Sequence, residues 1–240
     1  MTVMSAGIWP LEPRMSVERI DWDDPAWREN PWFQVVLERT YFARAFCQDA
    51  RVLDAPCGCG WSSSKFAERA KYVLGVDYAD EAIAVAQQRY RSPNLEFRQM
   101  NCLSLELDDA SFDVAVSIEA MEHFNHSDGL RYIAELAHVL RPGGFLVGTT
   151  PSAHGRKDAA IRLEREKNEF HLKIFWPQEL RRCLRRHFEE VSLVAMPNGG
   201  FFFWARKSIG WKNKVRSAVP EPFRPWLTQA NQLVRRSFPR

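Results

Sequence analysis

The sequence predicts an α/β fold in which helices cover both faces of a doubly wound, mostly parallel sheet of seven strands. Short apolar runs alternate with longer segments of helical character, which is the order that builds a parallel sheet. A glycine-bearing turn follows the first of these runs, at residues 54–60. Only Pro197-Asn198-Gly199 separates the last two runs, which predicts an antiparallel C-terminal hairpin at one edge of the sheet.

The predicted elements follow an N-terminal stretch that is rich in tryptophan and proline. Residues 1–30 are expected to form an extended arm, and the first helix is expected at 31–47. Pro177 opens the last predicted helix, where its missing N–H costs no helical hydrogen bond. The expected strands are 51–54, 72–76, 95–98, 112–118, 144–150, 188–195 and 200–206, and the further helices are 62–70, 79–91, 128–140 and 177–187.

The turn from Asp54 to Gly60 has the features of a nucleotide-binding site. Gly58 and Gly60 have no Cβ, so a ligand can approach the backbone closely there. Asp77 ends the next apolar run, about 20 residues later, where an open α/β sheet places an acid that accepts hydrogen bonds from both ribose hydroxyls. The turn and the acid together predict a cofactor that contains adenosine.

The details of the turn exclude two common kinds of nucleotide site. The third glycine of the dinucleotide motif is absent, because Trp61-Ser62-Ser63 follows Gly60, and the Trp61 indole would crowd a pyrophosphate. A phosphate-binding loop is excluded because no Gly-Lys-Ser/Thr follows the turn. The remaining ligand is a nucleoside without phosphates.

Four sequence blocks in order resemble the class I S-adenosylmethionine-dependent methyltransferases: VLDAPCGCG, GVDYADEAIAVAQQRY, FRQMNCLSLELDDASFDVAVSIEAMEHF and ELAHVLRPGGFLVGTTP. The resemblance implies a Rossmann-like fold, S-adenosyl-L-methionine as cofactor and S-adenosyl-L-homocysteine as product. Two segments, EAMEHF and NEFHLKIFWPQEL, resemble the branch that methylates small molecules, quinone precursors and cell-surface sugars. The implied activity is an O-methyltransferase that acts on a hydroxyl of a small molecule, a glycan or a lipid-linked precursor.

The resemblance also implies where the cofactor contacts the chain. Pro56 departs from the family, which most often has a glycine there, and it removes one backbone donor. Asn101 stands where an acid often contacts the adenine, and its amide can still accept from and donate to the base. The residues carried over are Asp54, Gly58 and Gly60 at the methionine end, Asp77 at the ribose, Tyr78 and Asn101 around the adenine and Glu119 on the sulfonium side, with Ala55 and Cys102 completing the set.

Methyl transfer depends mainly on alignment, because the cofactor already carries the leaving group. A hydroxyl acceptor also loses a proton, and histidine suits a base that works near neutral pH. His123 follows the strand 112–118 and His171 lies in a segment expected to cover the substrate, so both are candidate bases. Glu119 is expected to bind the substrate or a histidine. For each histidine, a purely structural role remains the alternative.

Two neighbours of these candidates receive different interpretations. His126, three residues after His123, is expected to be exposed to solvent. Glu122 is expected to be an acid at a helix start, where a negative charge complements the helix dipole.

Composition sets the domain organisation. A chain of 240 residues with 45% hydrophobic content suffices for one well-buried α/β domain. That domain is expected at 31–206 and includes a lid at 152–176, whose basic residues would face an acidic or phosphate-bearing acceptor. The five cysteines lack paired spacing, so reduced thiols are expected, with no disulfide framework and no metal site. The N-terminal residues lack the order of a signal peptide, so a cytoplasmic location is expected.

The predicted tail, 207–240, is strongly basic and contains aromatic residues. From Arg206 to Arg240 there are nine Lys or Arg and one acid, Glu221, which gives a charge of +8. Such a tail fits peripheral contact with an anionic membrane, in which each cation contributes roughly 1 kcal/mol. It also fits RNA, or a solvated segment without a partner. An RNA-modifying methyltransferase and a cofactor-binding module without catalysis therefore remain the alternative functions, although no separate nucleic-acid-binding module is present.

Overall fold

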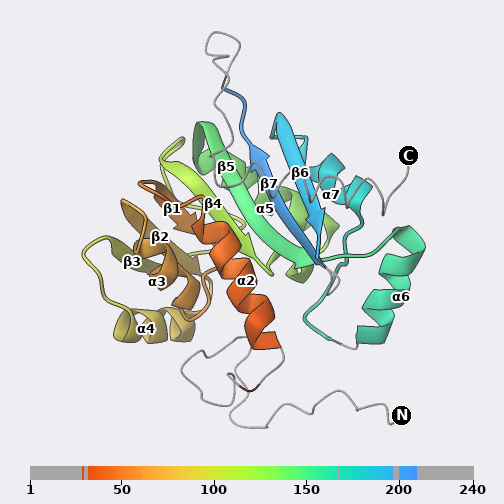
Figure 1. The fold of residues 1–240 in the computed structure, drawn as a ribbon, viewed down its shortest axis with the longest axis horizontal. Coiled ribbons are helices and arrows are strands. Elements are labelled where there is room, and N and C mark those ends of the chain that lie inside the picture. Colours follow the sequence, from red (N-terminus) through yellow and green to blue (C-terminus); the bar gives the residue numbers. More distant parts are fainter. Residues whose placement is uncertain (1–28, 30–31, 167, 197–199, 210–240) are drawn as a thin grey trace.

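The computed structural model describes residues 29, 32–166, 168–196 and 200–209 (Figure 1). Seven strands form one sheet in the order β3-β2-β1-β4-β5-β7-β6. The strands are β1 (Arg51–Asp54), β2 (Tyr72–Asp77), β3 (Leu95–Gln99), β4 (Phe112–Ile118), β5 (Leu140–Pro151), β6 (Glu190–Ala195) and β7 (Gly200–Arg206). The helices are α2 (Trp32–Arg44), α3 (Trp61–Ala67), α4 (Asp80–Arg89), α5 (His126–Val139), α6 (Arg156–Glu166) and α7 (Pro177–Leu184), with the short 3₁₀ helix η1 (Met121–His123).

The strand pairing confirms the predicted fold class. β1 pairs in parallel with β2 on one side and with β4 on the other, so the chain changes direction across the sheet at β1. β7 runs antiparallel to both β5 and β6, which makes the C-terminal hairpin. In open sheets of this kind, ligands bind outside the carboxyl ends of the strands at the point where the order reverses.

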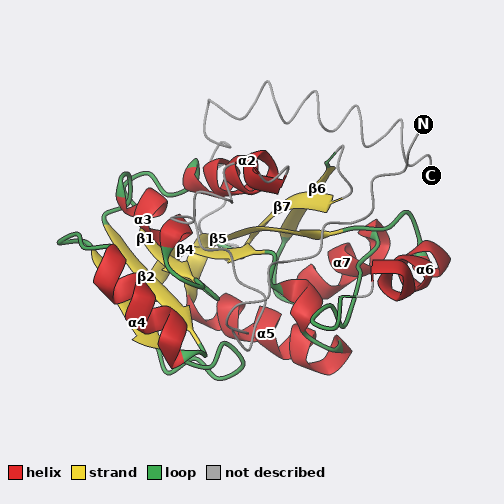
Figure 2. Ribbon diagram, turned by 90° about the horizontal axis from the view of Figure 1, so that it is seen from below, coloured by secondary structure: helices red, strands yellow, loops and turns green. Residues whose placement is uncertain are grey.

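Helices cover both faces of the sheet (Figure 2). α2 and α3 contact each other on one face, above a core cluster that includes Val52, Val116 and Trp204. α5 and α7 contact each other on the opposite face, above the larger cluster. Tyr132 of α5 is fully buried in that cluster, and its hydroxyl donates to the Ala55 carbonyl and contacts Ser117 Oγ at 2.9 Å. This side chain therefore attaches α5 to the residue that begins the glycine-bearing turn.

Several element boundaries differ from the predicted ones. α5 begins at His126 because the Asn125 side chain accepts from the backbone N–H of Asp128 and caps the helix. β5 begins at Leu140, since Phe112 pairs with Leu140 before a shift of register. The predicted lid, 152–176, contains a helix, α6, which was not predicted because its sequence is highly charged. Ala159 on α6 is nevertheless buried beside Ala153 and Ile174.

Some predictions fall outside the described residues. They are the N-terminal arm apart from Glu29, the turn at 197–199 and the basic tail from residue 210 onward. Among the described residues, no helix is long and apolar enough to cross a membrane.

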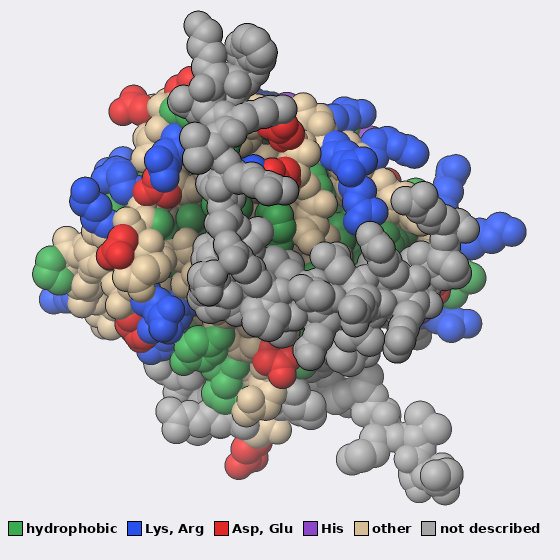
Figure 3. Space-filling view, turned by 45° about the horizontal axis from the view of Figure 1, so that its top comes forward, with side chains coloured by type: hydrophobic (Ala, Val, Ile, Leu, Met, Phe, Trp, Pro, Cys, Tyr) green, Lys and Arg blue, Asp and Glu red, His purple; other side chains and the backbone are tan. Residues whose placement is uncertain are grey.

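The described part of the chain also carries concentrated positive charge. Basic side chains are visible along the right-hand side of the face shown in Figure 3. On and after α7, a groove of about 390 Å³ is lined by Gln178, Arg181, Arg182, Arg185 and Arg186. No acid lines this groove, so its potential is positive. The sequence had suggested a basic surface only on the lid and the tail.

Candidate functional site

The sheet brings the predicted cofactor residues to one edge. Asp54 ends β1, Asp77 ends β2, Asn101 follows β3 and Glu119 follows β4. These four strands are adjacent, in the order β3-β2-β1-β4, and they run parallel, so their carboxyl ends lie at the same edge. The topology therefore gathers residues that are up to 65 positions apart in the sequence.

The two glycines of the turn suit their positions for different structural reasons. Gly58 has φ +54°, and a Cβ built there would meet nothing within 4 Å, so space beside its backbone is open. Gly60 has φ +84°, and a Cβ there would lie 2.7 Å from both Ala86 Cβ and Phe97 Cζ. Gly60 is therefore needed for close packing against α4 and β3, and its contact with a ligand stays a prediction. Gly58 keeps the open approach.

The Asp54 carboxylate accepts hydrogen bonds from the start of α3. Its Oδ2 accepts hydrogen bonds from Ser62 Oγ at 2.9 Å and Ser63 Oγ at 2.6 Å. Burial is the main cause that raises the pKa of Asp54 to about 7, while the two hydroxyls act in the opposite direction. Through Ser62 and Ser63, Asp54 thus joins the end of β1 to the first turn of the helix after the turn.

Asp77 connects the end of β2 to the same turn. One carboxylate oxygen accepts from the backbone N–H of Gly58 at 2.9 Å, and the other accepts from the N–H of Ala79 at 3.0 Å. A carboxylate has about four acceptor positions, so these two bonds leave capacity for ribose hydroxyls. The turn and its acid are therefore held together as one unit before any ligand arrives.

The predicted adenine residues differ in how far they can reach a ligand. Tyr78 is 73% exposed, so its ring is available as a stacking surface beside the end of β2. The Asn101 Oδ1 accepts from the N–H of Leu103 at 2.9 Å, which leaves its amide hydrogens for a ligand. The Cys102 side chain is buried in the large core cluster, where desolvation raises the pKa of the thiol to about 12. Only the backbone of Cys102 can therefore meet an adenine.

The cysteines are reduced thiols, as the sequence suggested. All five lie among the described residues, are buried and form no disulfide: Cys47, Cys57, Cys59, Cys102 and Cys183. Burial raises the pKa of the Cys57 thiol well above its ordinary value, so it is protonated and unreactive at neutral pH.

Glu119 adopts an uncommon backbone conformation directly after β4. Its φ is +44°, in the left-handed region that non-glycine residues seldom adopt, and its N–H donates to the Thr149 carbonyl. Its Oε2 lies 2.7 Å from the Arg39 guanidinium, a side chain on α2 that is only 7% exposed. Sequence reasoning missed Arg39, because the Glu38-Arg39 pair within a helix gives no indication of which charge faces the sheet.

Glu122 lies in the first turn of a helix, as expected, but it is not exposed to solvent. It is fully buried on η1, and its Oε2 accepts from Thr150 Oγ1 at 3.0 Å. Burial, followed by the nearby Glu119 carboxylate, raises the pKa of Glu122 well above its ordinary value. Thr150 on β5 is a long-range partner that sequence spacing does not reveal.

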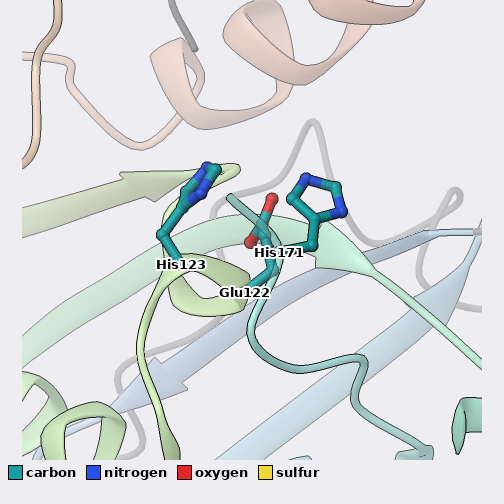
Figure 4. Close-up of side chains that lie close together, drawn as sticks. All are labelled: Glu122, His123 and His171. Atoms are coloured by element: carbon teal, nitrogen blue, oxygen red, sulfur yellow. The ribbon is translucent and has the colours of Figure 1, made fainter. Parts of the chain in front are cut away.

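The structure brings the two candidate histidines together. The backbone carbonyl of Glu122 accepts from the N–H groups of Leu172 and Lys173, and His123 Nδ1 donates to the Phe170 carbonyl at 3.0 Å. These contacts hold the lid segment against η1. As a result, the His123 and His171 rings meet edge to face, with centroids 5.3 Å apart, and the Glu122 carboxylate lies between them (Figure 4). His126 is exposed, as expected.

The region that carries the site is similar to known proteins. Residues 52–144, which contain the turn, Asp77, Asn101, Glu119 and the histidine-bearing η1, match the family model described as a methyltransferase domain. This stretch, which is less than half of the chain, is similar to a methyltransferase domain. The cofactor is S-adenosylmethionine, in agreement with a site that lacks phosphate-binding features.

Two relatives are similar to this methyltransferase domain. A protein of Mycolicibacterium smegmatis, named a probable S-adenosylmethionine-dependent methyltransferase, is 39% identical over 127 residues, which are 52% of this chain and 47% of the relative. The phthiotriol/phenolphthiotriol dimycocerosates methyltransferase of Mycobacterium leprae is 37% identical over 99 residues, which are 40% of this chain and 36% of the relative. The chain thus spans less than half the length of these relatives.

A solved structure supports the methyltransferase fold over a larger region. The N-methyltransferase NodS of Bradyrhizobium japonicum, in complex with S-adenosyl-L-homocysteine, has a TM-score of 0.61 and covers 78% of this chain and 93% of its own. At 16% identity, this likeness concerns the fold alone. In this chain the matched region, 52–144, is followed by the rest of β5, the lid segment, α7 and the β6–β7 hairpin.

Proposed function

We propose that this protein is an S-adenosylmethionine-dependent methyltransferase that transfers a methyl group to a hydroxyl of a small molecule, a glycan or a lipid-linked precursor. The observation that carries the proposal is the meeting of His123 and His171 on either side of Glu122, just after β4, whose carboxyl end lies at the edge where the cofactor residues gather. An alcohol has to lose a proton during methylation, and imidazole is the side chain best suited to accept one near neutral pH.

The cofactor contacts follow from the unit formed by the turn and Asp77. Asp77 accepts from the ribose hydroxyls, Tyr78 and the Asn101 amide contact the adenine, and the methionine end lies along Gly58. Ala55, Asp54 and Gly60 support this turn from behind, through Tyr132, Ser62 and Ala86. Glu119, held by Arg39, faces the sulfonium, where a carboxylate favours the positive charge of the bound cofactor.

The proposed reaction is a direct displacement. The acceptor oxygen forms a bond to the methyl carbon while the carbon–sulfur bond breaks, and sulfur keeps the electron pair to give S-adenosylhomocysteine. The acceptor proton passes to a histidine of the pair. Because His123 Nδ1 donates to a backbone carbonyl, the neutral ring carries its lone pair on Nε2, so Nε2 is the accepting atom.

The lid segment exposes apolar side chains. Leu172, next to His171 in the sequence, is 53% exposed, and Ile161 on α6 is 45% exposed. This composition suits an acceptor with a hydrocarbon portion. The names of the relatives that act on phthiotriol and phenolphthiotriol dimycocerosates point in the same direction, because phthiotriol is an alcohol by name.

The test compares His123→Ala and His171→Ala with His126→Ala, an exposed histidine on the same connection. Methyl transfer is measured as S-adenosylhomocysteine release with matched hydroxyl, amine and thiol acceptors. We expect methyl transfer only to the hydroxyl acceptor. Turnover should fall by about 10²-fold or more in whichever of the two variants lacks the base. Cofactor affinity and the turnover of His126→Ala should not change.

Two results would reject this proposal. Unchanged turnover in both His123→Ala and His171→Ala would contradict the assignment of the base. Methyl transfer to amines alone would contradict the proposal of a hydroxyl acceptor. An RNA-modifying enzyme would instead need RNA binding that weakens steeply with salt. If no acceptor in a cell extract were methylated, the chain would be a cofactor-binding module.

A further inference from the structure

Three side chains with metal-binding atoms converge at the contact between η1 and the lid segment. One ligand atom from each of Glu122, His123 and His171 lies within 4.8 Å of the other two. Figure 4 shows the Glu122 carboxylate between the two rings, which come from separate parts of the chain. Metal–ligand bonds of about 2.1 Å place tetrahedral ligand atoms roughly 3.4 Å apart, so an ion would draw these atoms together by at most about 1.4 Å.

His123 is already oriented as metal-binding histidines usually are. A carbonyl oxygen only accepts, so Nδ1 of His123 donates its hydrogen to the Phe170 carbonyl, and the lone pair is on Nε2. Histidine ligands in proteins commonly donate their second ring N–H to a carbonyl in this way, which holds the tautomer and the ring orientation. The lid segment supplies that acceptor and also carries His171.

Glu122 supplies an independent indication of a missing ligand. Its Oε2 accepts from Thr150, whereas its buried Oε1 has no hydrogen-bond partner among the described residues. A buried acceptor without a partner is costly, and a second carboxylate, Glu119, lies nearby. Arg39 is paired with Glu119, at 2.7 Å. An ion beside Glu122 would give its Oε1 the partner that the described residues do not supply.

We propose that Glu122, His123 and His171 bind one divalent transition-metal ion. Two imidazoles and one carboxylate suit Zn²⁺, Co²⁺ or Ni²⁺, whereas Mg²⁺ and Ca²⁺ prefer oxygen ligands alone. Three protein ligands leave a fourth position open for water or another small ligand. The inference departs from the expectation of no metal site, which depended on cysteine spacing.

The metal site rests on geometry and does not require the proposed function. The two roles exclude each other at any one moment, because an ion on His123 Nε2 occupies the lone pair that a base would use. Binding is therefore tested without measuring turnover, so that failure of one proposal leaves the other standing.

The experiment uses the untagged full chain after removal of metals with a chelator. Co²⁺ is titrated in, and the visible absorption of imidazole-bound Co²⁺ reports binding, with Zn²⁺ and Mg²⁺ added as competitors. We expect one Co²⁺ per chain, displacement by Zn²⁺ and no displacement by a large excess of Mg²⁺. Loss of one ligand in His171→Ala or Glu122→Gln should weaken binding by about 100-fold or more.

The matched control is His126→Ala, which removes an exposed histidine close to the site and should bind Co²⁺ as the unchanged chain does. Thermal melting of each metal-free variant identifies a folding defect, and His171→Ala on the lid is the variant expected to fold normally. Absence of the absorption bands, equal weakening in His126→Ala, or displacement by Mg²⁺ would each overturn the proposal and leave an adventitious ion only.

Discussion

Individual residues of the glycine-bearing turn serve either packing or ligand approach, although their sequence context is the same. Gly58 and Gly60 both have positive φ, yet only Gly60 has neighbours at the position that a Cβ would take. Asp54 and Asp77 both end strands, but Asp54 binds two serines while Asp77 binds the turn backbone. The residue types were predictable from the motif, and the division of roles was not, because Phe97 and Ala86 approach the turn from later in the chain.

The difference between the glycines gives a prediction at the residue scale. Gly60→Ala should destabilise the fold by about 3 kcal/mol, because its Cβ would collide with Ala86 and Phe97 and φ is strained. Gly58→Ala should cost about 1 kcal/mol, from backbone strain alone. Thermal melting and cofactor titration measure both effects, and Gly58→Ala should have the larger effect on cofactor affinity. Equal losses of stability would contradict this interpretation.

At the scale of elements, α2 contributes to the candidate site although it precedes the methyltransferase domain match. Arg39 on α2 pairs with Glu119 after β4, and Phe42 of the same helix contacts Phe202 on β7. The helix was predicted from its sequence, but its partner was not, since the pairing depends on how α2 crosses the sheet. Similarly, the lid segment was expected to cover the substrate, and hydrogen bonds to Glu122 and His123 show how it is held.

The Arg39–Glu119 pair predicts coupling between α2 and β4. Arg39→Met should lower the free energy of unfolding by about 2 kcal/mol, because it leaves a partly buried carboxylate without its partner. A double-mutant cycle with Glu119→Gln, followed by urea unfolding, measures the coupling energy. The exposed Lys65–Glu68 pair is the control, and its coupling should be about 0.5 kcal/mol or less. Coupling no larger than in the control would show that the pair does not join the two elements.

For the whole molecule, the order of the strands creates the site. Asp77 is predicted to hold the ribose only because β2 lies beside β1, so the acid and the turn share one edge. This arrangement cannot be obtained from any single segment of the sequence. The arginine-lined groove, by contrast, is lined by residues of one segment, on and just after α7.

Cofactor binding should stabilise the whole molecule. S-adenosylmethionine or S-adenosylhomocysteine at 100 times its Kd should add about 2.7 kcal/mol, a rise in Tm of roughly 5–10 °C. NAD should give no shift, and Asp77→Asn should lose the shift, whereas Asp80→Asn, on the exposed start of α4, should keep it. The melting temperature without ligand separates lost binding from lost stability. A shift with NAD alone would contradict the assignment of the turn.

The sequence by itself determined the fold class, the order of most elements and the kind of cofactor, because alternating apolar runs and a strand–turn–acid motif are local signals. It also indicated His123 and His171 as candidate bases. Only the tertiary structure decided that these rings meet around Glu122, that Glu122 is buried, that Gly60 serves packing and that Arg39 reaches Glu119. Each of these contacts joins residues distant in sequence, and their burial and pairing depend on the packed arrangement of several elements.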